Sequence, residues 1–434
     1  LKAAMEEREK NGVRSNAKFE PYERVLFTEE MRDNYTILVP QMSPIHFTYF
    51  SEAMKSCGYN VDLLPAVDEN AVNEGLRYIN NDACYPTIVT LGQIISALKS
   101  GKYDLNKTAV FMSQTGGGCR ASNYVSLLRK ALTDLDMPQV PVVSFNMVGL
   151  EKNPGFKITF NMGFKLLLGA IYGDLMMRLL YATRPYEAKK GSTEALLESW
   201  HDRIIDNILN FKKKDYEANL KKIVEEFDNL ERLDIKKPKV GVVGEILVKY
   251  HPNANNGIVD IIEDEGGEAV VLDLLDFFLY GMYSKQYNLK YLSGKFTEAK
   301  INQLAIKVIE MLRKPMRKAL RESMHYTEPG YIHETAEAAT KVISLGNQCG
   351  EGWLLTGEMI ELIHGGAPNI VCLQPFACLP NHVTGKGVMK SLREMNPYAN
   401  IAAIDYDPGA SDVNQLNRIK LMMTTARKNF KDAN

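Results

Sequence analysis

The segment from Asn81 to Asn146, NDACYPTIVTLGQIISALKSGKYDLNKTAVFMSQTGGGCRASNYVSLLRKALTDLDMPQVPVVSFN, decides the fold because a related pattern returns near the C-terminus. The second copy runs from Cys349 to Asp407 and reads CGEGWLLTGEMIELIHGGAPNIVCLQPFACLPNHVTGKGVMKSLREMNPYANIAAIDYD. Each copy gives a cysteine, an amphipathic helix, a Gly-containing turn, an apolar strand, a cysteine-bearing loop, a helix and a strand. We therefore predict an α/β protein with two Rossmann-like lobes, whose parallel sheets are related by an internal repeat.

The cysteines of the two copies correspond in position. A glycine lies eight residues after Cys84 in the first copy and eight residues after Cys349 in the second. A glutamine ends the predicted central strand five residues before Cys119, and another ends the matching strand four residues before Cys378. Ligands of parallel α/β sheets gather outside the carboxyl ends of the strands. If the two lobes face each other, both sets of cysteines therefore converge on one cleft.

The chain divides into four parts by its patterns of apolar and charged residues. Short apolar runs alternate with helical periods in two stretches, and a charged, helical stretch lies between them. The predicted parts are an N-terminal connector (1–35), a first α/β lobe (36–150), a helical segment (151–236) and a second α/β lobe (237–434).

Composition excludes several classes of protein. The 434 residues are 45% hydrophobic and carry a formal net charge of -1, which gives no electrostatic case for binding nucleic acid or an anionic membrane surface. The most apolar segment, 162–182, is interrupted by Lys165, Asp174 and Arg178, so we expect a buried helix and no membrane span. No signal-peptide pattern opens the sequence, and we expect a cytoplasmic protein.

Six cysteines without a secretory signal indicate metal or redox roles more than disulfides, although free cysteines are also common as small buried hydrophobes. Cys57 is expected to be such a packed residue, because it ends a helix just before a glycine. Cys84 precedes a proline at the first turn of a predicted helix, where the helix dipole and free amides favour a thiolate ligand. We therefore predict that Cys84 binds metal.

Three successive glycines, Gly116, Gly117 and Gly118, come directly before Cys119 at the start of the next helix. Such a run lets the backbone approach an inserted group closely and point its amides at that group. A phosphate cradle is the alternative, but the Walker spacing and its Lys-Ser/Thr pair are absent. We predict a cluster-binding loop in which Cys119 is a metal ligand.

The second copy supplies three more predicted metal ligands, Cys349, Cys372 and Cys378, and His382 is a further candidate. The spacing between the last two cysteines does not by itself distinguish zinc from an iron-sulfur cluster.

Carboxylates and one histidine of the second lobe admit a catalytic interpretation, but we favour a simpler one. Glu351, Glu358 and Glu361 lie on or just before an amphipathic helix, where charges are mostly on the surface. His251 follows a predicted strand and is expected to be an ordinary loop histidine.

Six segments carry a resemblance to a known family: NNDACYP, MSQTGGGCRASNY, GLEKNPGFKIT, GEGWLLTGEM, CLQPFACLPNH and DYDPGASDVNQLNRIKLM. Together they resemble the C-terminal portion of the large CoA-substrate-specific enzyme activases. That region is related to the 2-hydroxyacyl-CoA dehydratase and benzoyl-CoA reductase subunits and to the double-cubane cluster proteins. The similarity extends over nearly the whole chain from about Lys18 onward.

The resemblance implies an iron-sulfur protein that works as a low-potential reductase or electron-transfer component. Its electrons would come from an ATP-dependent activase, either separate or fused upstream, and it implies a homodimer that could act on an acyl-CoA substrate. The cofactor would be a 4Fe-4S cluster or a double cubane. The family motifs include Cys84, Cys119, Cys372 and Cys378, and the internal repeat adds Cys349.

Two other functions remain open from sequence. One is dehydration of a 2-hydroxyacyl-CoA by ketyl-radical chemistry at a 4Fe-4S cluster. The other is a zinc-stabilised interaction module.

Overall fold

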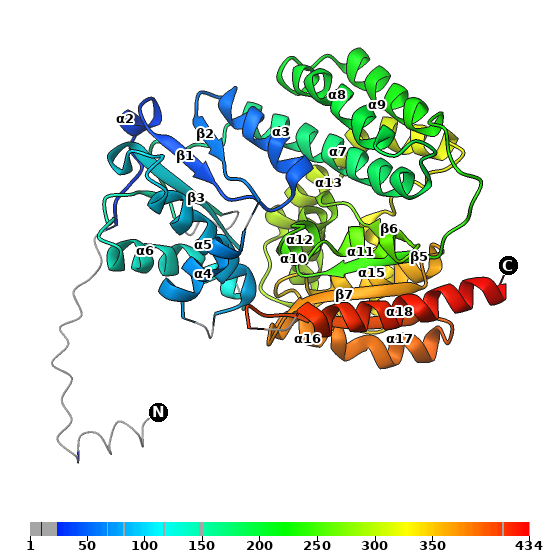
Figure 1. The fold of residues 1–434 in the computed structure, drawn as a ribbon. Coiled ribbons are helices and arrows are strands. Elements are labelled where there is room, and N and C mark those ends of the chain that lie inside the picture. Colours follow the sequence, from blue (N-terminus) through cyan, green and yellow to red (C-terminus); the bar gives the residue numbers. More distant parts are fainter. Residues whose placement is uncertain are drawn as a thin grey trace.

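Two parallel sheets form the framework of the protein, as the computed structural model in Figure 1 shows. The structure describes residue 10 and residues 24–66, 68–80, 83–115, 118–146, 151–409 and 412–433. The first sheet has the order β2-β1-β3-β4 and the second the order β6-β5-β7-β8. The strands are β1 (Thr36–Val39), β2 (Asn60–Leu63), β3 (Thr108–Gln114), β4 (Val142–Asn146), β5 (Lys239–Gly244), β6 (Glu268–Val271), β7 (Asn369–Pro375) and β8 (Asn400–Tyr406).

The two sheets have the same topology, because in each the second strand lies outside the first and the third and fourth follow on the other side. Every pairing within both sheets is parallel. The predicted α/β fold with two Rossmann-like lobes is therefore confirmed. In each sheet the strand order reverses between the first and third strands, because the second strand is added on one side and the third and fourth on the other. Such a topological switch point opens a crevice at the carboxyl ends of these two strands.

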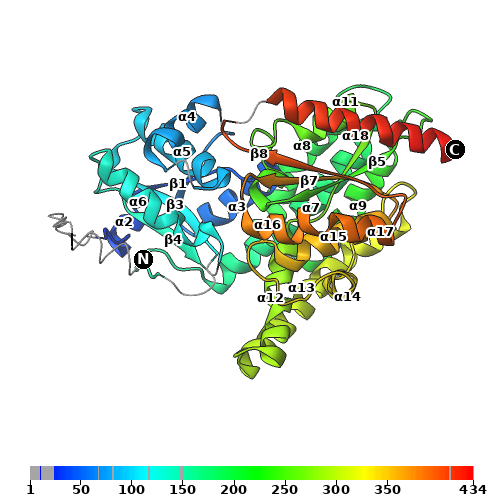
Figure 2. The same ribbon diagram turned by 90° about the horizontal axis from the view of Figure 1, so that it is seen from below.

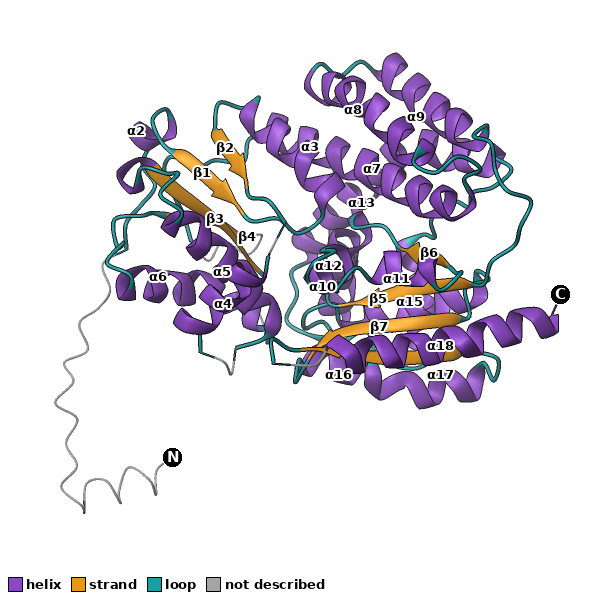
Figure 3. Ribbon diagram, viewed as in Figure 1, coloured by secondary structure: helices purple, strands orange, loops and turns teal. Residues whose placement is uncertain are grey.

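Helices connect the strands of the first lobe and cover both of its faces (Figure 3). Pro44 starts α3, and the Asp68 side chain caps α4 by accepting a hydrogen bond from the Ala71 amide, as expected at helix starts. The helices described in this part are α2 (Glu29–Arg32), α3 (Pro44–Lys55), α4 (Glu69–Tyr78), α5 (Tyr85–Lys99) and α6 (Tyr124–Asp134).

The second lobe follows the same plan but carries a helical insertion between β6 and β7. Three helices, α12 (Leu275–Tyr291), α13 (Phe296–Glu322) and α14 (Ile332–Thr340), precede α15 (Gly352–His364), which is the counterpart of α5. The remaining helices are α10 (Ile246–Tyr250), α11 (Ile258–Asp264), α16 (Leu379–Thr384), α17 (Met389–Met395) and α18 (Asp412–Ala433).

The matched glycines of the repeat, Gly92 and Gly357, have the same structural role. A Cβ atom on Gly92 in α5 would collide with the backbone carbonyl of Ala71 in α4. A Cβ atom on Gly357 in α15 would collide in the same way with the carbonyl of Thr335 in α14. The glycine eight residues after each cysteine therefore lets the cysteine-bearing helix cross its neighbour at backbone distance.

The helical segment between the lobes shares one core with the insertion of the second lobe. Its helices are α7 (Phe160–Thr183), α8 (Ser192–Leu209) and α9 (Lys213–Asp228), and their buried side chains pack with those of α12, α13 and α14. The helical body is thus built from two separate stretches of sequence; in Figure 1, α8 and α9 lie at the upper right and α12 and α13 lie in the centre. The sequence predicts the segment 151–236 as helical but does not indicate that it packs with the insertion of the second lobe.

One helix in the described part of the chain, at 160–186, is long and apolar enough to cross a membrane by length and composition. Of its most apolar stretch, 72% is buried inside the protein, as we expected for a core helix. Its charged residue Asp174 is fully buried and accepts a hydrogen bond from His46 at 2.9 Å.

Candidate metal centre

Four cysteines occupy the N-terminal ends of helices at the edge where the strands end. Cys84 is the N-cap residue of α5, and Cys378 is the N-cap residue of α16 directly after β7. Cys119 caps a short 3-10 turn that leads into α6, and Cys349 lies three residues before α15. Backbone amides without intrahelical partners point outward at such positions and favour negatively charged sulfur.

Two cysteines of the first lobe, Cys84 and Cys119, lie near Tyr124. The Sγ atom of Cys84 is 3.4 Å from the Tyr124 hydroxyl and 3.1 Å from Thr87 Oγ1. Burial raises the pKa of Tyr124 well above its ordinary value, and the neighbouring thiols of Cys84 and Cys119 raise it further. Both thiols therefore belong to the same local environment.

The cysteines of the second lobe meet them across the boundary between the lobes. A Cβ atom on Gly118, the residue before Cys119, would lie 3.1 Å from the Sγ atom of Cys349. The loop that carries Cys349 also contacts the start of α16, because a Cβ atom on Gly350 would lie 3.2 Å from the ring of Pro380, two residues after Cys378. The fold therefore brings Cys84, Cys119, Cys349 and Cys378 together from four separate loops.

The lobes pack against each other next to these loops. The ring of Tyr85 stacks on that of Tyr406 with 6.4 Å between centroids. Val89 of α5 packs in one apolar cluster with Leu247 and Ala254 of the second lobe. Because Tyr85 directly follows Cys84, this contact fixes the first-lobe cysteines relative to the second lobe.

Two carboxyl groups lie beside the cysteines. The Glu245 side chain caps α10 by accepting a hydrogen bond from the Val248 amide at 2.9 Å. The Glu351 side chain accepts from the Ile246 amide at 3.0 Å and from Asn381 Nδ2 at 2.8 Å. Burial, with Glu351 as a second cause, raises the pKa of Glu245 to about 8, and burial raises the pKa of Glu351.

Two thiols of this site, those of Cys119 and Cys378, are held in the protonated form at neutral pH when no cation is present. Burial raises the pKa of Cys119 to about 12 and that of Cys378 to about 12, and the carboxyl groups of Glu351 and Glu245 add to both shifts. A bound metal reverses this preference, because its positive charge stabilises the thiolates that coordinate it. The site is therefore electrostatically suited to a cationic guest.

Two buried polar atoms beside the cysteines lack a hydrogen-bond partner in the described part of the protein: the Tyr280 hydroxyl and Asn381 Oδ1. The Tyr280 side chain is 4% exposed, and its hydroxyl lies against Gly352, three residues after Cys349. The Asn381 amide nitrogen lies 3.4 Å from Cys378 Sγ. Buried polar groups in native proteins nearly always have a partner, such as protein, ordered water or a ligand, so the Tyr280 hydroxyl is free to donate to a group bound in this site.

Not all predicted site residues join this group. Cys372 is fully buried within β7, and its Sγ atom faces the apolar layer under α15, where a Cβ atom on Gly385 would lie 3.0 Å away. Cys57 lies at the end of α3, where its carbonyl accepts a hydrogen bond from Arg32, consistent with the expected packing role. Gly116 and Gly117 lie outside the described residues.

The expectation that the carboxylates of the second lobe are surface charges is wrong for two of them. Glu351 and Glu358 are both buried, and Glu358 forms an ion pair with the buried Lys249 at 2.8 Å. The physical reason is that α15 is enclosed on nearly all sides, so its polar residues point into the protein as well as its apolar ones. Burial raises the pKa of Glu358 despite the lysine beside it.

His251 is also no ordinary loop residue, because its side chain is fully buried. Its Nδ1 atom accepts hydrogen bonds from the backbone amides of Asn253 and Ala254, both at 3.2 Å. His382, a candidate ligand from sequence, is partly exposed on α16, and its Nδ1 atom has no hydrogen-bond partner among the described residues.

Sequence reasoning missed Glu245 and Tyr280. In sequence, the apolar run VGEILV simply continues the strand, whereas β5 ends at Gly244 and Glu245 is the N-cap of a helix. Glutamate is not among the preferred N-cap residues, so no local signal marks this helix start. Tyr280 comes from the helical insertion, which has no counterpart in the first copy of the repeat.

The described residues contain no group of three or more His, Cys, Asp or Glu side chains arranged to hold a single metal ion. A cubane distributes its ligands over four irons, so its cysteines need not converge on one point.

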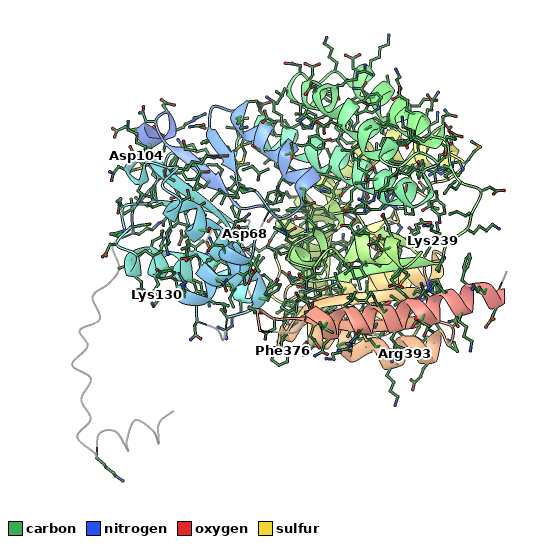
Figure 4. All side chains as sticks on the ribbon, in the orientation of Figure 1. Asp68, Asp104, Lys130, Lys239, Phe376 and Arg393 are labelled. Carbon is green, nitrogen blue, oxygen red and sulfur yellow. The ribbon has the colours of Figure 1, made fainter. Side chains whose placement is uncertain are left out.

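Two cavities lie elsewhere, one of about 600 Å³ between α12 and residues 340–345 and one of about 1200 Å³ at the opposite edge of the second sheet. In Figure 4, the labelled Phe376 marks the loop that leads from β7 to Cys378.

Comparison with protein-family models and with curated proteins finds no match for this chain in either. The geometry of the cysteines and the quoted motifs therefore carry the functional argument.

Proposed function

We propose that the chain is an iron-sulfur protein that acts as a low-potential reductase or electron-transfer component. Cys84, Cys119, Cys349 and Cys378 would hold the cluster at the boundary between the lobes. The observation that carries this proposal is the meeting of four cysteine-bearing helix starts from both lobes around Glu245 and Glu351. Four thiolates are the ligand set of a 4Fe-4S cluster.

The surroundings of the thiols support a cluster as the guest. Gly118 leaves open the space beside Cys349 that any side chain would fill. The Tyr280 hydroxyl is available to donate a hydrogen bond to a cluster sulfur, and Asn381 Nδ2 donates to Cys378 Sγ at 3.4 Å; such bonds orient and tune an iron-sulfur centre. A double cubane would need further ligands, and Cys372 lies in the interior of the second sheet.

The low reduction potential is proposed from the family resemblance. A bound cluster would supply one-electron chemistry, and its potential depends on the net charge and hydrogen bonding around it. Burial raises the pKa of Glu245 to about 8, so this carboxyl group is mainly neutral at pH 7 and adds little negative charge beside the cluster. The resemblance to the activase family, and not the charge of the site, favours an energy-driven electron donor such as an ATP-dependent activase.

Anaerobic purification or reconstitution, followed by quantification of iron and sulfide per chain, tests the proposal. We expect about four irons and four sulfides per chain and visible absorption that bleaches on reduction. A colourless protein that binds zinc without sulfide would refute the proposal in favour of the zinc-stabilised module. Turnover of a 2-hydroxyacyl-CoA in the presence of activase and ATP would instead identify the dehydratase.

A further inference from the structure

A row of large apolar side chains lies exposed along the hairpin formed by α12 and α13, which projects from the body of the protein in Figure 2. A soluble helix normally buries its apolar face and exposes its polar one. Here α13 buries Ile309 and Met316 against the helical body and exposes a second apolar face. The exposed residues are Tyr291, Leu292, Phe296, Ile301, Leu304, Val308 and Met311, with exposed fractions between 41% and 68%.

The exposed face of α13 has the spacing of a coiled-coil seam. Ile301, Leu304, Val308 and Met311 follow one another at intervals of three, four and three residues, which are heptad positions a, d, a and d. The a positions hold β-branched residues and the d positions hold leucine and methionine. Among parallel coiled coils, this combination favours two strands. Pro315 stands at the next a position and ends the seam.

The apolar area is sufficient for a stable interface. A large side chain presents roughly 150–200 Å² when fully exposed. Seven side chains with the fractions given above therefore offer roughly 600–800 Å², which reaches the ~800 Å² per partner of a standard interface only when the hairpin tip, with Tyr291, Leu292 and Phe296, is buried together with the α13 seam. A patch of this size is larger than monomeric proteins usually leave open.

The charges beside the seam select the orientation of the partner. The g positions hold Lys300 and Lys307, and the e positions that they would face across a parallel pair hold Ala305 and Leu312. Lysine stems can cover Ala305 and the part of Leu312 that does not pack against the helical body, while their ammonium groups stay in water. In an antiparallel pair the lysines of one helix would instead face the lysines of the other, at a cost in electrostatic repulsion.

We infer that the α12–α13 hairpin is the dimerisation element of this protein and that α13 pairs with α13 of a second copy, parallel and in register. The inference rests on the hairpin alone and does not depend on the proposed cluster.

Sedimentation velocity of the whole protein at micromolar concentration tests the inference. We expect the parent to sediment as a dimer with twice the chain mass of 48.8 kDa. Leu304→Glu should produce monomers, because it places two carboxylates opposite each other in an apolar seam. Leu421→Glu is the matched control, since Leu421 is 70% exposed on α18, and it should stay dimeric. Circular dichroism of both variants should equal that of the parent.

A second variant tests the orientation. Met311→Cys should form a disulfide-linked dimer under mild oxidation, because parallel helices place residue 311 of both copies side by side. In an antiparallel pair centred between Leu304 and Val308, the two copies of residue 311 would lie about 15 Å apart along the helices. Leu421→Cys and the parent, oxidised in the same way, are the controls for the native cysteines.

Three outcomes would overturn the inference: a monomeric parent, a Leu304→Glu variant that stays dimeric, or no more cross-linking of Met311→Cys than of Leu421→Cys. Salt gives a further distinction. Parallel pairing through apolar contacts should persist at high ionic strength, whereas an acidic partner held by Lys300 and Lys307 would be released. A monomer that binds acidic protein only at low salt would assign the surface to such a partner instead.

Discussion

Gly118 of the first lobe lies in contact with Cys349 of the second, since a Cβ atom on the glycine would be 3.1 Å from the cysteine Sγ atom. This contact joins the two halves of the internal repeat at the loops that bear their cysteines. It also leaves no room for a side chain at position 118 unless the Cys349 thiol moves.

The first prediction follows from that contact. Gly118→Val should lower the iron retained per chain to a small fraction of the parent value, because the branched side chain displaces the Cys349 thiol. The measurement is iron and sulfide content after anaerobic reconstitution and desalting. Gly163→Val is the control, since a Cβ atom there has no neighbour within 4 Å. Full cluster content in the Gly118 variant would show that Cys349 is not a ligand.

The second prediction separates the cysteines by their placement. Alanine at Cys84, Cys119, Cys349 or Cys378 should abolish cluster binding. Alanine at Cys372 should leave iron content unchanged and lower the free energy of unfolding by about 1–2 kcal/mol, because it removes only a buried sulfur from the apolar layer under α15.

Cys57→Ala is the control for the second prediction, and it should match the parent in iron content. The sequence predicted Cys372 as a ligand because it lies in a family motif, so loss of cluster in Cys372→Ala would restore that assignment. It would also mean that β7 shifts when the cluster binds.

The fold and the positions of the cysteines could be predicted because both depend on local signals. The alternation of short apolar runs with helical periods predicts parallel α/β layers, and Pro86 after Cys84 marks a helix start. The repeat added long-range information that a single sequence rarely offers, since equivalent loops of two equivalent sheets come to equivalent edges.

The rest of the site could not be predicted because it depends on tertiary burial. Helix α15 has polar residues at helical spacing, so Glu358 reads as a surface charge until the packing of α14 and α12 encloses it. Tyr280 reaches the cysteines from an insertion with no repeat partner. Cys372 was predicted as a ligand although it lies within the predicted strand, and only the packing of α15 against β7 shows that its side chain faces the apolar layer.

The third prediction concerns the buried ion pair of Lys249 and Glu358. Lys249→Met should destabilise the protein by roughly 3–5 kcal/mol, because it leaves a carboxyl group buried without its cation. The double variant Lys249→Met with Glu358→Leu should be more stable than this single variant and within about 2 kcal/mol of the parent. Urea unfolding of the three proteins measures both differences. Equal stability of the single and double variants would show that the unpaired Glu358 carboxyl group is not the source of the loss.

The fourth prediction is a pH dependence that originates at His251. Burial lowers the pKa of His251 from 6.5 to about 4, and its Nδ1 atom accepts two backbone hydrogen bonds that a protonated ring could not accept. Because the folded-state pKa lies below the unfolded-state value, the neutral ring stabilises the fold fully above pH 6.5. That contribution is lost progressively as the pH falls toward 4, and by linkage it amounts to roughly 3 kcal/mol.

His251→Asn isolates this contribution from the other groups that titrate in the same range. An asparagine can accept the amide hydrogen bond two residues on through its own Oδ1 atom, and it does not titrate. Urea unfolding of parent and variant between pH 7 and pH 4 should show the parent losing about 3 kcal/mol more than the variant over this range. Parallel pH profiles for the two proteins would show that the buried histidine is protonated in the folded state, and that the two amide hydrogen bonds do not hold it neutral.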